Sequence, residues 1–149
     1  MTPEQIKLVQ DSFAKVAPIA ETAADIFYDR LFEIAPAVRP MFPAEMTDQK
    51  TKLMQTLGVA VNNLHQVETI LPTIEDLAKK HVGYGVKDEH YDTVGEALIF
   101  TLDKGLGDEF TPDVKDAWVE TYTLVAGAMK SAAATVEPPK KGFFSKIFG

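Results

Sequence analysis

The chain has 149 residues, a net charge of −7 and no cysteine. This length suits one domain with a full hydrophobic core. The lack of cysteine excludes disulfides, thiolate zinc sites, cysteine-ligated iron–sulfur clusters and cysteine nucleophiles, and it fits a reducing, cytoplasmic location. The negative charge argues against a nucleic-acid partner, because binding to phosphates needs basic residues.

The first half of the chain reads as helices separated by prolines. Thr2, Pro3 and Gln5 predict an N-cap, a first-turn proline and a capping box. Pro18 is expected to end this helix and to begin a second one. The inward residues of these two helices are Ile6, Val9, Phe13 and Val16, then Ala23, Ile26, Phe27, Leu31 and Ile34.

Short turns are expected next, at Pro36, Pro40 and Pro43. Thr47 and Asp48 then predict the cap of a longer helix. Its apolar stripe consists of Leu53, Leu57, Ala60 and Leu64.

Three more helices complete the pattern. Pro72 predicts the start of a short helix that ends at His81, with Gly83 and Gly85 closing it. The other two helices are expected over residues 89–105 and from Thr111-Pro112 onward. Their inward residues are Val94, Leu98 and Leu102, then Trp118, Tyr122, Val125 and Met129. Strand-like alternation is absent, so the sequence predicts an all-α domain over residues 1–135.

Motifs of the common enzymes are missing. Gly83-Tyr84-Gly85 begins like a dinucleotide-binding turn, but Asp88 stands where a third glycine belongs and no strand precedes it. Ser12, Ser131 and Ser145 are expected on helix surfaces or in the tail. The sequence therefore predicts no conventional hydrolase or phosphotransferase site.

His81 is the most informative residue. It follows Ile74 by seven residues, Leu77 by four and Ala78 by three, so it lies on an apolar helix stripe. An inward imidazole needs a partner, because an unpaired buried polar group costs about 1–3 kcal/mol. The partner could be a side chain, a backbone carbonyl or a metal.

Three upstream residues could form the other half of a pocket. Tyr28 lies on the core side of the second helix, Phe42 is held in a proline-bounded turn, and Gln49 heads the apolar stripe of the long helix. Each also has a purely structural reading, as a core tyrosine, a core phenylalanine or a first-turn helix residue. His65 and His90 are given no ligand role.

These residues belong to a series of short segments in a fixed order across residues 3–135. The segments are Phe27-Tyr28-x-x-Leu31-Phe32 with Pro36, Val38-Arg39-Pro40-x-Phe42, Gln49-x-x-x-Leu53-Met54, Leu71-Pro72, Lys80-His81, His90-Tyr91-x-x-Val94-Gly95 and Ala117-Trp118-x-x-x-Tyr122. In this pattern the chain resembles the bacterial single-domain globins, which are related to the haem domain of flavohaemoglobins.

The resemblance implies a globin fold, a three-over-three helical sandwich around haem b (iron protoporphyrin IX). It implies that His81 is the proximal ligand of the iron and that Phe42 packs on the porphyrin. Tyr28 and Gln49 would reach the distal ligand, and Leu53 would limit access to it. The remaining expected pocket residues are Lys80, Tyr91, Val94 and Tyr122.

One departure bears on reactivity. Flavohaemoglobins place a glutamate on the last helix beside the proximal histidine and a tyrosine; Tyr91 matches the tyrosine, but Ala133 stands at the glutamate position. Without this carboxylate the imidazole should donate fewer electrons to the iron. We therefore expect a reversible O₂ binder more than a peroxidase-like site.

Three functions remain open. The first is a haem globin that binds O₂, NO or other diatomic ligands for storage, delivery or NO and redox defence. The second is NO dioxygenation assisted by a separate reductase, since flavohaemoglobins carry flavin and nicotinamide domains of their own. The third is a haem-free sensor or interaction module with a globin fold.

The tail, residues 136–149, is a separate question. Up to Glu137 the chain carries 12 basic against 22 acidic residues, a net charge of −10, and the residues beyond it carry three lysines and no acid. If the tail is helical, Phe143, Phe144, Ile147 and Phe148 share one side. Between Lys140 and Phe148 the sequence is therefore compatible with weak peripheral contact with an anionic membrane. A flexible tail or docking to a partner are the alternatives.

Overall fold

A computed structural model describes residues 1–83 and 86–135. In the described residues every regular element is helical. The α-helices are α1 Pro3–Val16, α2 Ala20–Ile34, α3 Thr47–Asn62, α4 Leu71–Gly83, α5 Asp88–Leu106 and α6 Pro112–Thr135. The 3₁₀ segments are η1 Ala17–Ile19, η2 Pro36–Met41, η3 Leu64–Thr69 and η4 Gly107–Glu109. The all-α prediction is confirmed.

The start of α1 follows the sequence closely. The Thr2 side chain accepts a hydrogen bond from the backbone N–H of Gln5, and the Gln5 side chain accepts one from the backbone N–H of Thr2. This reciprocal capping box satisfies two donors that the first turn would otherwise expose.

Three predicted helix boundaries are wrong by a few residues. Pro18 lies in η1, and α2 begins only at Ala20. The N-cap of α3 is Met46, with no side-chain hydrogen bond, because the Glu45 carboxylate accepts from the backbone N–H of Thr47 instead. Helix α4 continues past His81 to Gly83. The predicted closing residue Gly85 lies outside the described residues.

Ser12 corrects another expectation. It is buried, not on a helix surface, and its hydroxyl accepts a hydrogen bond from the Trp118 indole N–H at 2.8 Å. The Ser12 hydroxyl also lies 2.7 Å from the Leu8 carbonyl. This pair joins α1 to α6 and satisfies the indole N–H of the largest fully buried side chain in the core.

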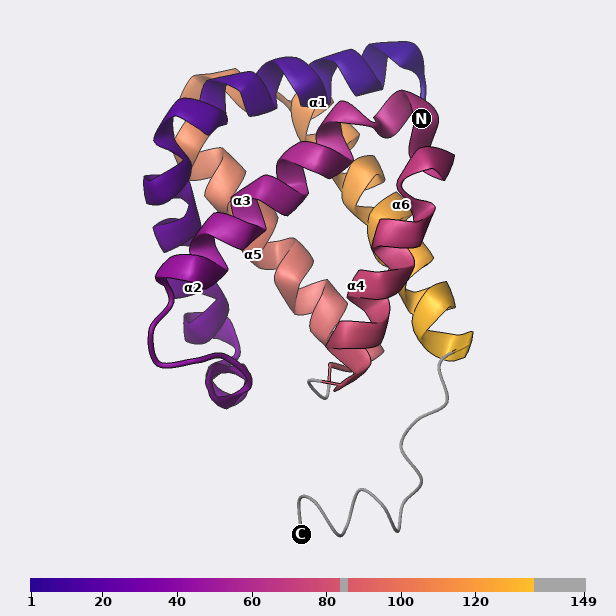
Figure 1. Ribbon diagram of the computed structural model, residues 1–149. Coiled ribbons are helices and arrows are strands. Elements are labelled where there is room, and N and C mark those ends of the chain that lie inside the picture. The colour runs from indigo at the N-terminus through magenta and orange to yellow at the C-terminus, as the bar shows by residue number, and fades with distance from the viewer. Residues whose placement is uncertain (84–85, 136–149) are drawn as a thin grey trace, which may run out of the picture.

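The helices form two layers. Helices α1, α3 and α4 make one layer, in front in Figure 1, and α2, α5 and α6 make the other. Between the layers, α4 and α1 pack against α6, and α3 packs against α2 (Figure 1). Within the second layer, α2 packs against α5. This is the three-over-three arrangement expected from the sequence.

The buried core is divided into two clusters. The larger cluster joins α1, α2, α5 and the first half of α6, and it includes Tyr28 and Trp118. The smaller one joins α4 to the second half of α6 and includes Tyr91 from the start of α5. The ring of Tyr122 packs against both. Helix α3 therefore packs on the larger cluster, and α4 packs on the smaller one.

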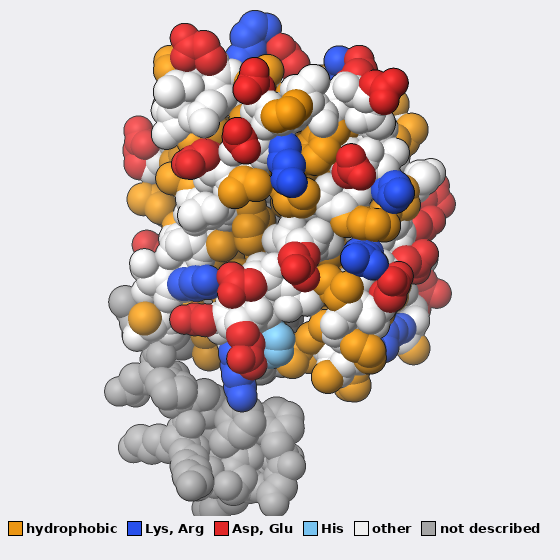
Figure 2. All heavy atoms as spheres, turned by 180° about the vertical axis from the view of Figure 1, so that it is seen from behind, with side chains coloured by type: hydrophobic (Ala, Val, Ile, Leu, Met, Phe, Trp, Pro, Cys, Tyr) orange, Lys and Arg blue, Asp and Glu red, His pale blue; other side chains and the backbone are white. Residues whose placement is uncertain are grey.

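The surface is predominantly acidic, as the net charge requires. Figure 2 shows one face of the molecule, on which acidic side chains are widely spread and basic ones lie between them. In the described residues, no helix is long and apolar enough to cross a membrane.

Candidate functional site

Tyr28 and Gln49 form the polar part of the upstream half-site. Tyr28 is buried on α2, with only 4% of its surface exposed. Gln49, in the first turn of α3, places its amide nitrogen 3.4 Å from the Tyr28 hydroxyl. Burial raises the pKa of Tyr28, and the Gln49 amide opposes this shift more weakly. The tyrosine is therefore a protonated hydroxyl that can donate a hydrogen bond.

Phe42 borders this pair. Its ring packs edge-on against Tyr28, at 5.6 Å between centroids, and against Phe32, at 5.4 Å. The turn around it is held by Arg39, whose guanidinium donates to the carbonyls of Phe42 and Pro43 at 3.3 and 3.0 Å. Arg39 has no predicted role in the site. The signal was the arginine between two turn prolines, where a guanidinium can bind several carbonyls at once.

His81 lies in the last turns of α4 and is half-buried. Its Nδ1 lies 2.6 Å from the Leu77 carbonyl. Because a carbonyl only accepts, Nδ1 carries the hydrogen, and the lone pair of the neutral imidazole is on Nε2. The Tyr91 ring lies nearly parallel to the imidazole, at 6.4 Å between centroids. The hydrogen bond to Leu77 and the contact with Tyr91 thus help to orient the imidazole.

Tyr91 and Tyr122 support this side of the site. The Tyr122 hydroxyl donates to the Tyr91 backbone carbonyl, which links α6 to α5. Burial is the main reason that the pKa of Tyr122 lies well above its usual range, with smaller contributions from Tyr91 and Asp92. A Cβ atom on Gly95 would lie only 2.8 Å from the Tyr122 ring. Glycine at position 95 therefore lets the ring lie directly against α5.

The remaining predicted site residues are less enclosed. Leu53 and Val94 are half-buried beside the larger cluster. Lys80 is exposed and pairs with Asp76 at 3.2 Å. Ala133 packs beside the smaller cluster, so it adds apolar contact where flavohaemoglobins are expected to place a carboxylate.

The described residues fit a flat apolar cofactor. In α3 only Val61 is fully buried, although Leu53, Met54 and Leu57 form a continuous apolar stripe. These half-buried side chains, together with Phe42 and Val94, offer an apolar lining that protein atoms alone do not fully cover. An imidazole with a defined tautomer and a buried tyrosine–glutamine pair supply the few polar groups that such sites need.

Comparison with known proteins agrees with this class of site. The family model described as Globin matches residues 25–129. The chain therefore belongs to the globin family, and haem is the cofactor that its relatives imply.

Individual relatives give the same result. A flavohemoprotein of Bacillus subtilis is 32% identical over 128 residues, which cover 83% of this chain and 32% of the relative. The chain thus spans about a third of that relative's length. Neuroglobin-1 of Oncorhynchus mykiss is 29% identical over 143 residues, covering 87% of this chain and 90% of that protein. A bacterial globin from Campylobacter jejuni superimposes with a TM-score of 0.82 at 27% identity, covering 89% of this chain and 96% of the other.

Proposed function

We propose that this globin holds haem b through His81 and reversibly binds O₂ or another diatomic ligand. When bound, haem supplies an iron atom with an open coordination position for a gas. The proposal rests on two polar groups that lie at different clusters of the core. Tyr28 with Gln49 lies in the larger cluster, and His81 lies beside the smaller one.

On the His81 side, the proposed role is to bind iron in a fixed orientation. Donation from Nδ1 to the Leu77 carbonyl holds the ring, and the same hydrogen bond selects the tautomer with its lone pair on Nε2. A neutral carbonyl is a weaker acceptor than a carboxylate, and Ala133 adds no charge nearby. These features favour a ligand of ordinary basicity, and therefore gas binding over peroxide chemistry.

On the Tyr28 side, the proposed role is to donate hydrogen bonds to the gas. The hydroxyl is protonated at neutral pH because burial raises its pKa. Gln49 adds an amide donor, and its long contact with Tyr28, 3.4 Å, is weak enough to be exchanged for a ligand. Leu53, one turn after Gln49, would border the same space. Phe42 and Val94 would pack on the porphyrin, with Tyr91 and Tyr122 behind His81 and Lys80 at the rim.

The test is the absorption spectrum of the purified protein after reconstitution with haem. We expect a Soret band and a stable oxygenated ferrous form. The His81→Ala variant should lose the five-coordinate ferrous spectrum, and added imidazole should restore it. A protein that takes up no haem would contradict the proposal and favour a haem-free interaction module.

A second candidate is NO dioxygenation with a separate reductase. It is favoured by the similarity of this chain to flavohemoproteins. The oxygenated protein should then convert NO once, and a reductase should be needed for continued turnover. If the oxygenated protein converts NO once and a reductase brings no further turnover, reversible gas binding remains the proposed function.

The contact expected between an anionic membrane and the segment from Lys140 to Phe148 lies outside the described residues. It stays a prediction. Co-sedimentation with anionic liposomes should be stronger for the full chain than for a chain ending at Val136, and equal binding would contradict it.

A further inference from the structure

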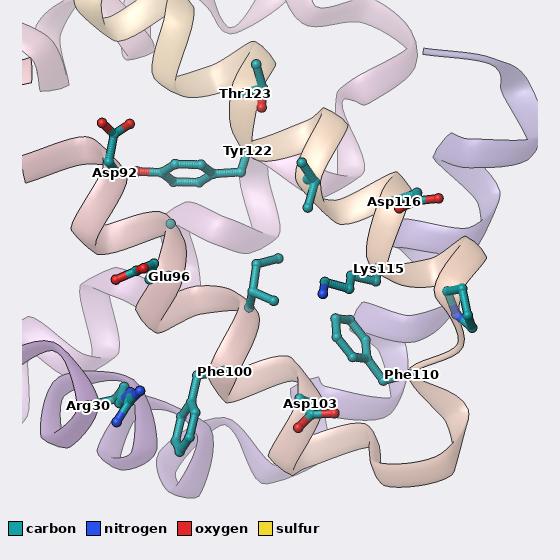
Figure 3. A pocket seen from close by; sticks show the side chains of 14 residues that line it. Arg30, Asp92, Glu96, Phe100, Asp103, Phe110, Lys115, Asp116, Tyr122 and Thr123 are labelled. Carbon is teal, nitrogen blue, oxygen red and sulfur yellow. The ribbon is translucent and has the colours of Figure 1, made fainter. Parts of the chain in front are cut away.

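A large hollow lies between α5 and α6, and Tyr122 is the one residue assigned to haem that also lines it. It has a volume of about 940 Å³. Its apolar lining consists of Ile99, Phe100, Phe110, Pro112, Val119 and the ring of Tyr122. Figure 3 shows Phe100, Phe110 and Tyr122 among the side chains that line it, with charged side chains between them. We refer to it as the α5–α6 hollow.

The charge of the α5–α6 hollow is negative. Its carboxylates are Asp92, Glu96, Asp103 and Asp116, and its basic groups are Arg30 and Lys115. Arg30 is already engaged, since it lies 4.5 Å from the centre of the Phe100 ring and pairs with Glu33 at 2.8 Å. Asp92 lies 3.7 Å from Lys130. Among the described residues, Glu96, Asp103 and Asp116 form no ion pair, so they can receive basic groups from outside.

The tail has the complementary composition. It carries three lysines and no acid after Glu137, and four large apolar residues within six positions. These apolar residues are Phe143, Phe144, Ile147 and Phe148. An apolar surface bordered by carboxylates is the kind of surface that recognises such a segment, because the rings need burial and the lysines need counter-charges.

The tail is also long enough to reach the hollow. Helix α6 lines the hollow from Pro112 to Thr123 and ends at Thr135. The end of α6 is therefore about 18 Å along the axis from the near edge of the hollow and about 35 Å from its far edge. An extended chain beginning after Thr135 spans up to about 28 Å by Phe143 and about 45 Å by Phe148.

We propose that residues 140–148 of this chain bind in the α5–α6 hollow of the same molecule. The aromatic rings lie on Ile99, Phe110 and Val119, and the lysines face Glu96, Asp103 and Asp116. Attachment to α6 raises the local concentration of the tail to the millimolar range, which favours the molecule's own hollow over a second copy. The hollow thereby shelters a segment that would otherwise be available to a membrane or another protein.

The test uses the full chain with a spin label at residue 145. Because the chain has no cysteine, the Ser145→Cys substitution provides a unique attachment site. Amide signals are compared before and after reduction of the nitroxide, in the diamagnetic ferrous carbonyl form. We expect severalfold broadening at Ile99, Lys115 and Val119, little at α3, and weaker broadening at high salt, where charge pairs are screened.

A matched pair of variants sharpens the result. Val119→Lys adds a positive charge to the lining of the hollow, and this charge repels the lysines of the tail. Val59→Lys makes the same change on α3. The two valines are 43% and 46% exposed, so the changes are equivalent in chemistry and setting. We expect Val119→Lys to abolish the broadening and Val59→Lys to leave it unchanged.

The outcomes separate the possible partners. Equal broadening when spin-labelled chains without isotope are mixed with isotope-labelled chains without a spin label would mean binding to a second copy, and it would overturn the proposal. The absence of broadening in buffer, combined with binding to phosphatidylglycerol vesicles that Val119→Lys does not alter, would also overturn it in favour of a membrane. Stronger vesicle binding by Val119→Lys than by Val59→Lys would support the proposal, because release from the hollow makes the tail available.

Discussion

At the scale of single residues, the proposed site depends on a few polar groups in apolar surroundings. Tyr28 and Gln49 share one weak hydrogen bond, and His81 is oriented through Leu77. Each group is therefore held in place by its neighbours. Its proposed role is to interact with the diatomic ligand or, for His81, with the haem iron. A single substitution here should change the free energy of ligand binding or of unfolding by about as much as one hydrogen bond contributes.

Tyr28→Phe should speed O₂ dissociation by roughly tenfold or more, because a hydrogen bond to a charged or strongly polarised group contributes about 1.5–3 kcal/mol. The rate is measured by stopped-flow displacement of O₂. The Soret band should be retained, since His81 is unchanged. An unaltered dissociation rate would show that Tyr28 does not reach the ligand.

Ser12→Ala should destabilise the fold by about 1–3 kcal/mol, because it leaves the Trp118 indole N–H buried without its acceptor. Urea unfolding measures the change, and ligand affinity should stay the same. The control is Ser131→Ala on the exposed side of α6, which should change stability by less than about 0.5 kcal/mol. Equal effects would mean that the Ser12–Trp118 bond contributes nothing.

Alkaline pH should reveal the burial of Tyr122. Its pKa is raised in the folded protein, so between the ordinary tyrosine pKa of about 10 and the raised value the unfolded chain binds fewer protons than the folded one. This contribution to stability is complete below about pH 10 and is lost as the pH rises further. The free energy of unfolding of Tyr122→Phe should therefore fall less steeply above pH 10 than that of the wild type. Parallel slopes would contradict the assignment.

At the scale of helices, the crossing of α5 and α6 is set by a glycine and a tyrosine. Gly95 provides the space in which the Tyr122 ring lies, and the Tyr122 hydroxyl reaches the Tyr91 carbonyl one turn earlier on α5. The same helices carry the α5–α6 hollow on their outer side. Changes at this crossing should therefore affect both the support of His81 and the hollow.

Gly95→Ala should destabilise the protein by about 1–3 kcal/mol, because the added methyl group would overlap the Tyr122 ring. Gly127→Ala, on α6, meets nothing within 4 Å and should instead stabilise it by about 0.5–1 kcal/mol through helix propensity. Thermal unfolding of the two variants compares them directly. Stabilisation by both would mean that Tyr122 moves aside without loss.

At the scale of the whole molecule, the division of the core explains how a cofactor could complete the fold. The larger cluster and the smaller cluster meet through Tyr122, while α3 packs mainly on α1 and α2 and α4 mainly on α6. The apolar stripe of α3 is only half-buried by protein, apart from Val61. A ligand bound there would join parts of the molecule that otherwise have few contacts.

Removal of haem should therefore lower stability and affect α3 and α4 more than the α1–α6 contact. At a haem concentration a thousandfold above its dissociation constant, binding stabilises the folded state by about 4 kcal/mol. Hydrogen exchange of the holo and apo forms measures the change helix by helix. Uniform loss of protection would argue that haem does not bridge the two clusters.

The sequence by itself determined the helical class, the capping box, the order of the helices and the resemblance that pointed to His81, Tyr28 and Gln49. These features depend on local spacing, and local spacing follows directly from the periodicity of a helix. The predicted helix boundaries near Pro18 and Thr47 were wrong, because alternative caps and 3₁₀ turns differ too little in free energy for residue type to distinguish them.

Only the tertiary structure decided which distant residues form hydrogen bonds with one another across the core. The burial of Ser12 against Trp118 joins positions 106 residues apart, and Arg39 holds its turn through carbonyls that only the folded backbone brings together. The α5–α6 hollow likewise combines residues from three helices. Contacts of this kind depend on the relative placement of whole helices, for which the sequence holds no local signal.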